Sequence, residues 1–421
     1  MFKKTILRNG LRIIVAPMRN TRAVTALVLV GIGSKYERKE INGISHFLEH
    51  MFFKGTKKRP HTFDIAKELD RIGGIYNAFT GKEYTGYFVK VDFSHLDLAL
   101  DVISDIFFNS LLASKEIVKE KKVILEEIKM YRDTPLHYIG DLWEELLYKG
   151  QPAGWHIIGT PETVSAINQK KLKNFLKNHY FAQNTAIGLA GRIDPEKGVE
   201  KIRKYFGKIK KGKVPQRPKV IEKQKKSETL LHYKKTDQTH LTLGVRGYNF
   251  FHSQRYAFGI LGVILGGNMS SRLFISLREK KGLAYYIKTE SHSDPDSGYL
   301  VTQAGVDHQR IGEAISLILK EYKKIALKRI SEEELNRAKD YIKGTMILGL
   351  EPSESLVSFY TSQELLEEKI LTPKEKLAKI DEVTIRDIQK VAKEIFQPQK
   401  LNLALIGPFR DKKPFEKLLT I

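Results

Sequence analysis

The chain has 421 residues, of which 41% are apolar and 29% charged, a composition typical of a soluble globular protein with two or three domains. The absence of cysteine excludes disulfides and thiolate ligands, so any metal ion would be held by histidine and carboxylate side chains. The net charge is +23, but acidic residues are interleaved almost everywhere and no nucleic-acid-binding motif accompanies the charge. We therefore interpret the charge as a solvated surface and expect no nucleic-acid partner.

Residues 1–17 have no secretory signal pattern, because their apolar run, 11–16, is short and interrupted by Arg12. No stretch approaches the ~20 apolar residues that a membrane-spanning helix needs. We therefore expect a cytoplasmic protein with no membrane partner.

The first third of the chain alternates between strand and helix patterns. Strands are favoured by alternating or continuous apolar residues, and helices by apolar residues three and four apart. The predicted elements are, in chain order, strands 5–15 and 23–31, helices 43–53 and 63–72, strands 75–80 and 84–92, and helices 96–109 and 115–132.

The helix over 43–53 carries two histidines and a glutamate on one face. His46 and His50 are one turn apart, and Glu49 lies between them. Two imidazoles at this spacing can bind one zinc ion, and a neighbouring carboxylate can take a proton from the zinc-bound water. His-x-x-Glu-His is a known metallopeptidase signature. The alternative is a pair of helix histidines that are satisfied by hydrogen bonds.

The helix over 115–132 presents two carboxylates beside its apolar stripe. Glu120 and Glu127, seven residues apart, lie on the flank of the stripe, whereas Glu126 lies on the opposite side among lysines. A carboxylate that faces a core is costly unless it is paired or bound to a metal. Glu120 and Glu127 are therefore candidates for a role at the site, and Glu126 is expected to be solvated. Pairing of both with buried Arg or Lys is the alternative.

The second half of the chain repeats the first in outline. Residues 207–226 are rich in Lys, Gly and Pro and predict a linker. After the linker, the order of strands and helices matches the first half, but the helix over 260–277 lacks the His-x-x-Glu-His run. We predict two copies of one α+β unit, with the metal site in the first copy only. The predicted parts are an N-terminal domain 1–210, a linker 211–226 and a C-terminal domain 227–421.

These motifs together resemble the pitrilysin and insulinase family (M16) of zinc peptidases, and above all its short bacterial members, which are similar to the mitochondrial processing peptidase. The resemblance implies one Zn²⁺ per chain on His46, His50 and Glu127, with Glu49 as the general base. Glu120 matches an acid that supports the site in the family. The implied fold is α+β, with two homologous domains that each pack a mainly antiparallel sheet with helices, as in LuxS and the processing peptidases.

Two further motifs match the family's substrate-binding residues. The edge strand along which family members hold a peptide corresponds to Asn77, Ala78, Phe79 and Thr80. In the second half, Arg278 and Tyr285 match an Arg and Tyr pair that binds the substrate carbonyl near the zinc. Some relatives divide the two motifs between different subunits. Because this chain carries both, the resemblance implies a homodimer in which each subunit completes the other's site.

The sequence therefore predicts a zinc endopeptidase of the inverzincin type, which cleaves unfolded peptides or small protein segments inside a chamber. The main alternative is a non-catalytic structural or accessory subunit of a processing-peptidase-like assembly. The intact residues His46, Glu49, His50 and Glu127 argue against that alternative.

Overall fold

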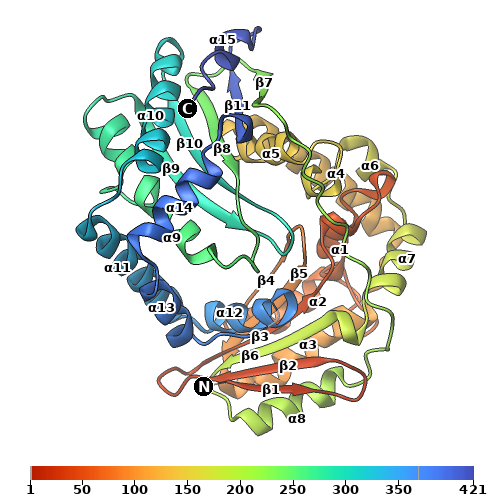
Figure 1. Ribbon diagram of the computed structural model, residues 1–421. Helices are drawn as coiled ribbons and strands as arrows, with labels where there is room; N and C mark the ends of the chain where they lie inside the picture. The colour runs from red at the N-terminus through yellow and green to blue at the C-terminus, as the bar shows by residue number, and fades with distance from the viewer. Residues whose placement is uncertain (1, 368) are drawn as a thin grey trace. The chain divides into compact units, whose positions relative to one another are not determined.

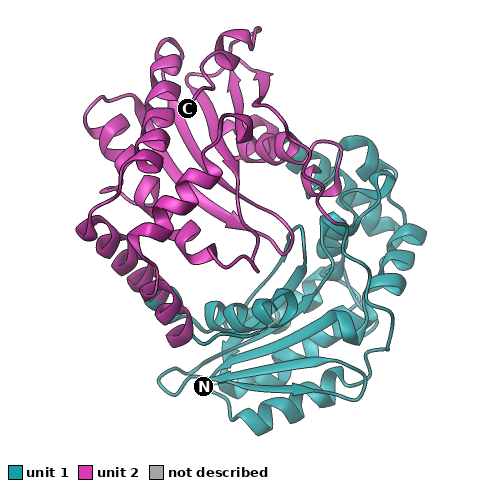
Figure 2. Ribbon diagram, in the orientation of Figure 1, with its two compact units in different colours: residues 1–129, 155–218, 347–372 teal, residues 130–154, 219–346, 373–421 magenta. Residues whose placement is uncertain are grey.

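The computed structural model describes residues 2–367 and 369–421. They form two compact units, shown in Figure 2. The segments of unit 1 are 1–129, 155–218 and 347–372, and those of unit 2 are 130–154, 219–346 and 373–421. Each unit contains one mainly antiparallel sheet that is packed with helices, which confirms the predicted α+β class.

The strands and helices of unit 1 are labelled in Figure 1. The strands are β1 (Lys3–Ile6), β2 (Arg12–Pro17), β3 (Ala23–Val30), β4 (Ile75–Thr80), β5 (Thr85–Asp92) and β6 (Thr185–Gly191). The helices are α1 (Ile44–Phe52), α2 (Thr62–Asp70), α3 (Leu96–Asn109), α4 (Ser114–Asp133, whose last residues fall in unit 2), α6 (Pro161–Ser165), α7 (Gln169–His179), α8 (Pro195–Phe206) and α12 (Ser353–Leu366).

The strands and helices of unit 2 follow the same pattern. The strands are β7 (Glu228–Tyr233), β8 (Thr239–Arg246), β9 (Ala284–Ser293), β10 (Gly298–Val306) and β11 (Leu401–Gly407). The helices are α5 (Pro135–Leu147), α9 (Arg255–Gly266), a π-helix at Phe274–Glu279, α10 (Ile311–Leu327), α11 (Glu332–Gly349, whose last residues fall in unit 1), α13 (Pro373–Asp381), α14 (Ile385–Ile395) and α15 (Lys413–Glu416).

The sheet of unit 1 has the order β1-β2-β6-β3-β5-β4, with β2 and β6 parallel and the other neighbours antiparallel. Alternate residues of its strands face opposite layers. Val24, Ala26 and Val28 pack in the core that contains α1 and α3, whereas Leu27 and Leu29 pack under α12. Strand β4, which the sequence predicts as a substrate-binding edge, is an edge strand of this sheet.

The sheet of unit 2 has the order β7-β11-β8-β10-β9. Its parallel pair is β7 and β11, so β7, β11, β8, β10 and β9 occupy the places of β2, β6, β3, β5 and β4. One face packs against α9, α10 and α14, and Ala404 and Ile406 on the other face pack under α5. The two sheets therefore have one topology, as expected for an internal repeat.

Each half of the repeat contributes one helix to the sheet of the other half. Helix α5 comes from the first half of the chain and packs on the sheet of unit 2, whereas α12 comes from the second half and packs on the sheet of unit 1. The compact units are therefore not consecutive stretches of chain. The domain boundaries near 210 and 227 stay a prediction, because the units follow packing and not the order of the repeat.

Several predicted elements differ from those observed. The single strand predicted over 5–15 is two strands, β1 and β2, because Gly10 has a φ of 89° and the Asn9 side chain accepts a hydrogen bond from the Leu11 N–H at 3.2 Å. The helix predicted over 260–277 is interrupted after Gly266, and the chain resumes as a π-helix. Helix α5 and strand β9 were not predicted. In the described part of the chain, no helix combines the length and apolar character needed to cross a membrane.

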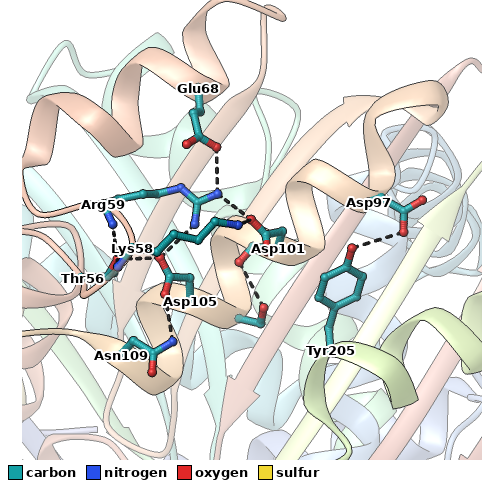
Figure 3. Close-up of polar contacts among 10 residues, drawn as sticks. Thr56, Lys58, Arg59, Glu68, Asp97, Asp101, Asp105, Asn109 and Tyr205 are labelled. Atoms are coloured by element: carbon teal, nitrogen blue, oxygen red, sulfur yellow. Dashed lines mark hydrogen bonds and ion pairs between the residues drawn. The ribbon is translucent and has the colours of Figure 1, made fainter.

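The segment that follows α1 is anchored by a buried arginine, shown in Figure 3. The Arg59 guanidinium is 2% exposed and donates to Asp105 and Glu68 at 2.8 Å and to Asp101 at 2.5 Å. Burial opposes its charge, but the hydrogen bonds to these three carboxylates outweigh that effect and raise the pKa of Arg59. The network ties the chain between α1 and α2 to α2 and α3, and so holds the C-terminal end of α1.

Candidate metal centre

The N-terminus of α1 is held by a buried carboxylate. Glu37 accepts hydrogen bonds from the N–H groups of Gly43, at 2.7 Å, and Ser45, at 2.8 Å, and from the Asn42 amide at 2.9 Å. Gly43 has a φ of 94°, and a Cβ there would lie 2.6 Å from the Ile158 carbonyl oxygen. Burial raises the pKa of Glu37 to about 7, against these hydrogen bonds, which lower it. The N-terminus of α1 is thus closely packed, so the helix cannot rotate freely about its axis.

The rest of α1 follows from its amphipathic sequence. The side chains on its inner face are buried in the core of unit 1 and leave both histidines on the opposite face. These buried residues are Ile44, Phe47, Leu48, Met51 and Phe52. The imidazole rings of His46 and His50 lie 4.6 Å apart between centroids, as expected for side chains one turn apart.

Helix α4 brings Glu127 to the two histidines. Its Oε1 lies 3.7 Å from His46 Nε2, and its Oε2 lies 3.6 Å from His50 Nε2. Within the described residues, these three side chains form a group whose ligand atoms all lie within 4.8 Å of one another. Hydrogen bonds are shorter than 3.6 Å, whereas ligands 2.0–2.2 Å from one tetrahedral ion are about 3.4 Å apart. The spacing therefore suits ligands around one ion.

The electrostatics also suit a metal. Burial, with a smaller contribution from His50, lowers the pKa of His46 to about 3, so this imidazole is in the neutral form that binds metals. Burial raises the pKa of Glu127, although His50 opposes the shift. Among the described residues, neither His46 Nδ1 nor Glu127 Oε2 has a hydrogen-bond partner. Two imidazoles and one carboxylate are a common donor set of catalytic zinc sites, so the residues fit Zn²⁺.

Glu120 contacts Nδ1 of His50, the ring nitrogen that does not face Glu127. Its Oε1 is 3.3 Å from His50 Nδ1, and its Oε2 is 2.7 Å from the Lys54 ammonium. Burial opposes ionisation of Glu120, but the hydrogen bonds with His50 and Lys54 prevail and lower its pKa. Glu120 thus pairs with a lysine, as in the alternative left open by the sequence, but that lysine is 26% exposed and not buried. In the described chain Glu127 has no Lys or Arg partner, and Glu126 is solvated and pairs with Lys129 at 2.8 Å.

Lys54 was missed in the sequence. It lies one helical turn beyond His50, and Glu120 is a buried carboxylate that needs a cation or donor nearby. This need was a signal, but the spacing alone does not say which lysine of the chain meets it.

The predicted base Glu49 contacts the edge strand. Thr80, the last residue of β4, donates a hydrogen bond to Glu49 Oε2 at 2.5 Å. Burial raises the pKa of Glu49, while the Thr80 hydrogen bond and His50 lower it and Glu127 adds to the rise. Burial raises the pKa of the Tyr87 and Tyr180 phenols, whose hydroxyl oxygens lie 3.1 Å apart, and the charge of Glu49 adds a smaller rise. Thr80 thus holds the carboxylate of Glu49.

The other predicted residues of β4 point to both faces of the strand. Ala78 packs toward the core that contains α1, and Phe79 packs on the opposite face, with its ring centroid 6.0 Å from that of Tyr84. Asn77 is exposed, and its Oδ1 accepts from the Ala78 N–H at 2.8 Å. In the described residues β4 pairs with β5 alone, so its outer backbone edge is available to an extended peptide.

Arg278 and Tyr285 belong to unit 2. Arg278 lies in the π-helix, with its guanidinium 5.0 Å from the centroid of the Phe274 ring. Tyr285 lies on β9 and is 75% exposed, and β9 occupies in its sheet the place that β4 has in unit 1. Unit 1 thus brings together the side chains of His46, Glu49, His50, Glu120 and Glu127, whereas these two residues belong to unit 2.

Two family models match the sequence. The model described as "Insulinase (Peptidase family M16)" matches residues 12–161, which contain the His–His–Glu cluster. The model described as "Peptidase M16 inactive domain" matches residues 166–342. Both halves of the chain are therefore similar to M16 domains.

Individual relatives match almost the whole chain. "Uncharacterized zinc protease YmxG" of Bacillus subtilis is 38% identical over 410 residues, which cover 97% of this chain and 98% of the relative. "Uncharacterized zinc protease SCO5738" of Streptomyces coelicolor is 32% identical over 98% of this chain and 90% of its own. The crystal structure of a protease from Helicobacter pylori has the same fold, with a TM-score of 0.90 and 24% identity over 97% of this chain and 100% of that chain. The chain therefore belongs to the peptidase M16 (insulinase) family.

Proposed function

We propose that this protein is a zinc-dependent endopeptidase of the short M16 form, which hydrolyses unfolded peptides or small protein segments. The observation that carries the proposal is the convergence of His46, His50 and Glu127, with both histidine–glutamate distances at 3.6–3.7 Å. These three residues would hold one Zn²⁺ per chain. The ion, when bound, supplies a Lewis acid that polarises the scissile carbonyl and makes water more acidic.

The residues around this cluster have distinct roles in the proposed reaction. Glu49 takes a proton from the attacking water and passes it to the leaving amine, while Thr80 holds its carboxylate by a hydrogen bond. Glu120 orients His50 through the ring nitrogen that does not face Glu127. The open edge of β4 binds the peptide backbone as an added strand, which favours extended, unfolded substrates.

A direct test is substitution of Glu49 by Gln. The amide cannot accept the proton of water, whereas the three proposed ligands stay intact. We expect zinc content near that of the wild-type protein but a loss of at least ~100-fold in hydrolysis of a quenched peptide. Metal content is measured by mass spectrometry on the same sample. A zinc-loaded variant that cleaves at the wild-type rate would reject Glu49 as the base.

We also propose that the protein acts as a homodimer, in which Arg278 and Tyr285 of one subunit stabilise the developing oxyanion at the other subunit's site. Support comes from the presence of both motifs in one chain. Mixing Glu49→Gln with Tyr285→Phe tests this idea. If Tyr285 acts across subunits, the mixed dimer has one intact site and regains activity. If Tyr285 acts within its own chain, neither site is intact and activity stays absent.

The alternative is an accessory subunit without activity of its own. The match of residues 166–342 to an inactive-domain model is the observation in its favour. It predicts that the purified protein with bound zinc leaves a broad peptide library uncut. Cleavage by the purified chain alone excludes this alternative, and the cut sites, read by mass spectrometry, give the sequence preference.

A further inference from the structure

A lysine is attached to the metal centre through a buried carboxylate. The two oxygens of Glu120 have different partners, His50 Nδ1 at 3.3 Å and the Lys54 ammonium at 2.7 Å. The Glu120 side chain is 4% exposed and that of Lys54 is 26% exposed. The ion pair is thus partly shielded from water. A partly buried ion pair has a more defined geometry than one at the surface.

The backbone fixes the origin of the lysine side chain. Lys54 follows the last turn of α1, and its N–H donates to the Met51 carbonyl oxygen at 3.1 Å. The segment just beyond it is tied down by the buried Arg59 network. The ammonium therefore approaches Glu120 from the same helix end that carries His50, while Glu120 itself belongs to α4.

This arrangement decides which nitrogen of His50 faces the third ligand. A carboxylate on Nδ1 favours the tautomer with hydrogen on Nδ1, which leaves the Nε2 lone pair directed toward Glu127 Oε2, 3.6 Å away. Among the described residues, Lys54 is the partner of the second oxygen of Glu120, so a Glu120 side chain without the ammonium can turn away from the ring. The pair with Lys54 keeps it in place.

We propose that Lys54 is a positioning residue for the metal centre, which acts by holding Glu120 against His50 Nδ1. This inference rests on the proposed zinc site but not on peptidase activity. The effect on zinc affinity that it predicts for removal of Lys54 is opposite to the effect expected from charge alone. Removal of a cation near the site would by itself favour Zn²⁺, whereas loss of positioning disfavours it.

The test is the zinc affinity of Lys54→Met, measured by competition with a chromophoric chelator. We expect a loss of about 10-fold or more, the range found when partners behind metal ligands are removed. Lys54→Arg should restore most of the affinity. Lys54→Met combined with Glu120→Gln should be no weaker than Glu120→Gln alone, because the lysine acts through Glu120.

The matched control is Lys129→Met. Lys129 forms an ion pair of similar length, 2.8 Å, with the exposed Glu126 on the outer side of α4, and its removal should leave zinc affinity unchanged. Lys54→Met with wild-type or tighter zinc affinity would overturn the inference. If wild-type protein binds no zinc, the proposed function fails instead, so the two failures are distinct.

A measurement without substitution covers the case in which Lys54→Met does not fold. The ¹⁵N chemical shifts of His50 in the metal-free wild-type protein report which ring nitrogen carries hydrogen. We expect hydrogen on Nδ1. Hydrogen on Nε2 would contradict the proposed orientation and overturn the inference.

Discussion

Two adjacent carboxylates of α4 have opposite surroundings. Glu127 faces the histidines of α1, whereas Glu126 is 72% exposed at its side chain and pairs with Lys129. The reason is the rotation of 100° per residue in a helix, which places neighbours on different faces. Which of these two chemically identical side chains faces the histidines is therefore decided by the helix face on which it lies.

Glu127→Gln should lower zinc occupancy at least ~10-fold, because a neutral amide is a poor ligand for a divalent ion. Glu126→Gln is the matched control and should keep wild-type occupancy. Zinc is counted per chain by mass spectrometry after dialysis against a weak chelator. Loss of zinc in the Glu126 variant alone would reverse the ligand assignment.

Glu37 is expected to make stability depend on pH. Burial raises its pKa to about 7, so the folded state holds this proton more tightly than the unfolded chain. The contribution of Glu37 to the free energy of unfolding should therefore fall as pH rises from 5 to 8, by about 2–3 kcal/mol. Glu37→Gln should remove this slope. Denaturation of both proteins at each pH gives the difference, and a wild-type protein that gains stability relative to Glu37→Gln toward pH 8 would show that the buried anion is favoured.

At the scale of elements, the site depends on how α1 is held at both ends. Its N-terminus is bound by Glu37, and the segment after its C-terminus is bound by Arg59 to α2 and α3. Neither residue belongs to the zinc motif. A helix that carries two ligands must be fixed more precisely than its own apolar face requires, since ligand positions within a few tenths of an ångström decide metal affinity.

Arg59→Met is expected to destabilise unit 1 by about 3 kcal/mol or more, because it leaves the buried carboxylate of Asp105 without its cation and removes the guanidinium from the partly exposed Asp101 and Glu68. Asp105, 5% exposed, is the most affected of them. Hydrogen exchange in urea measures the effect of each substitution on the amides of the unit that contains it. Arg310→Met is the control, since Arg310 and its partner Glu313 are both about 40% exposed and the change should cost less than about 1 kcal/mol. Equal effects of the two substitutions would contradict a stabilising role for the buried network.

For the whole molecule, the exchange of α5 and α12 makes each half of the chain dependent on the other. In unit 1, α12 covers one face of the sheet through Val357 and Tyr360, which pack on Ile14, Leu27 and Leu29. In unit 2, α5 covers the corresponding face. Without these helices each sheet would expose a continuous apolar face, a feature that promotes aggregation.

The fragments 1–218 and 219–421 should therefore be poorly soluble or bind hydrophobic dyes when each is produced alone. Produced together, they should purify as one complex, because each then supplies the helix that the other's sheet lacks. Size-exclusion chromatography and dye fluorescence measure both outcomes. A monomeric 1–218 fragment with native hydrogen-exchange protection and no dye binding would show that α12 is dispensable for unit 1.

The periodicity of the sequence was sufficient to predict α1, α3 and α4 closely, and with them the side chains that share a helix face. His46, Glu49 and His50 follow from one helical turn, and Glu120 and Glu127 from the flank of one stripe. The resemblance to M16 peptidases then implies Glu127 as the third ligand, which stays a prediction, whereas the family it named is confirmed. The turn at Asn9-Gly10 is also encoded locally, because Gly tolerates a positive φ and Asn accepts a hydrogen bond from the backbone two residues on.

Only the tertiary structure decided which residues from distant parts of the chain meet. The contact of Lys54 with Glu120 and that of Thr80 with Glu49 join different elements, and no local period encodes them. The same holds for the exchange of α5 and α12 between the sheets. Periodicity reports the direction of a side chain relative to its own helix or strand. Which element lies in that direction is settled by packing of the whole chain, where burial of apolar surface selects one arrangement among many with the same local pattern.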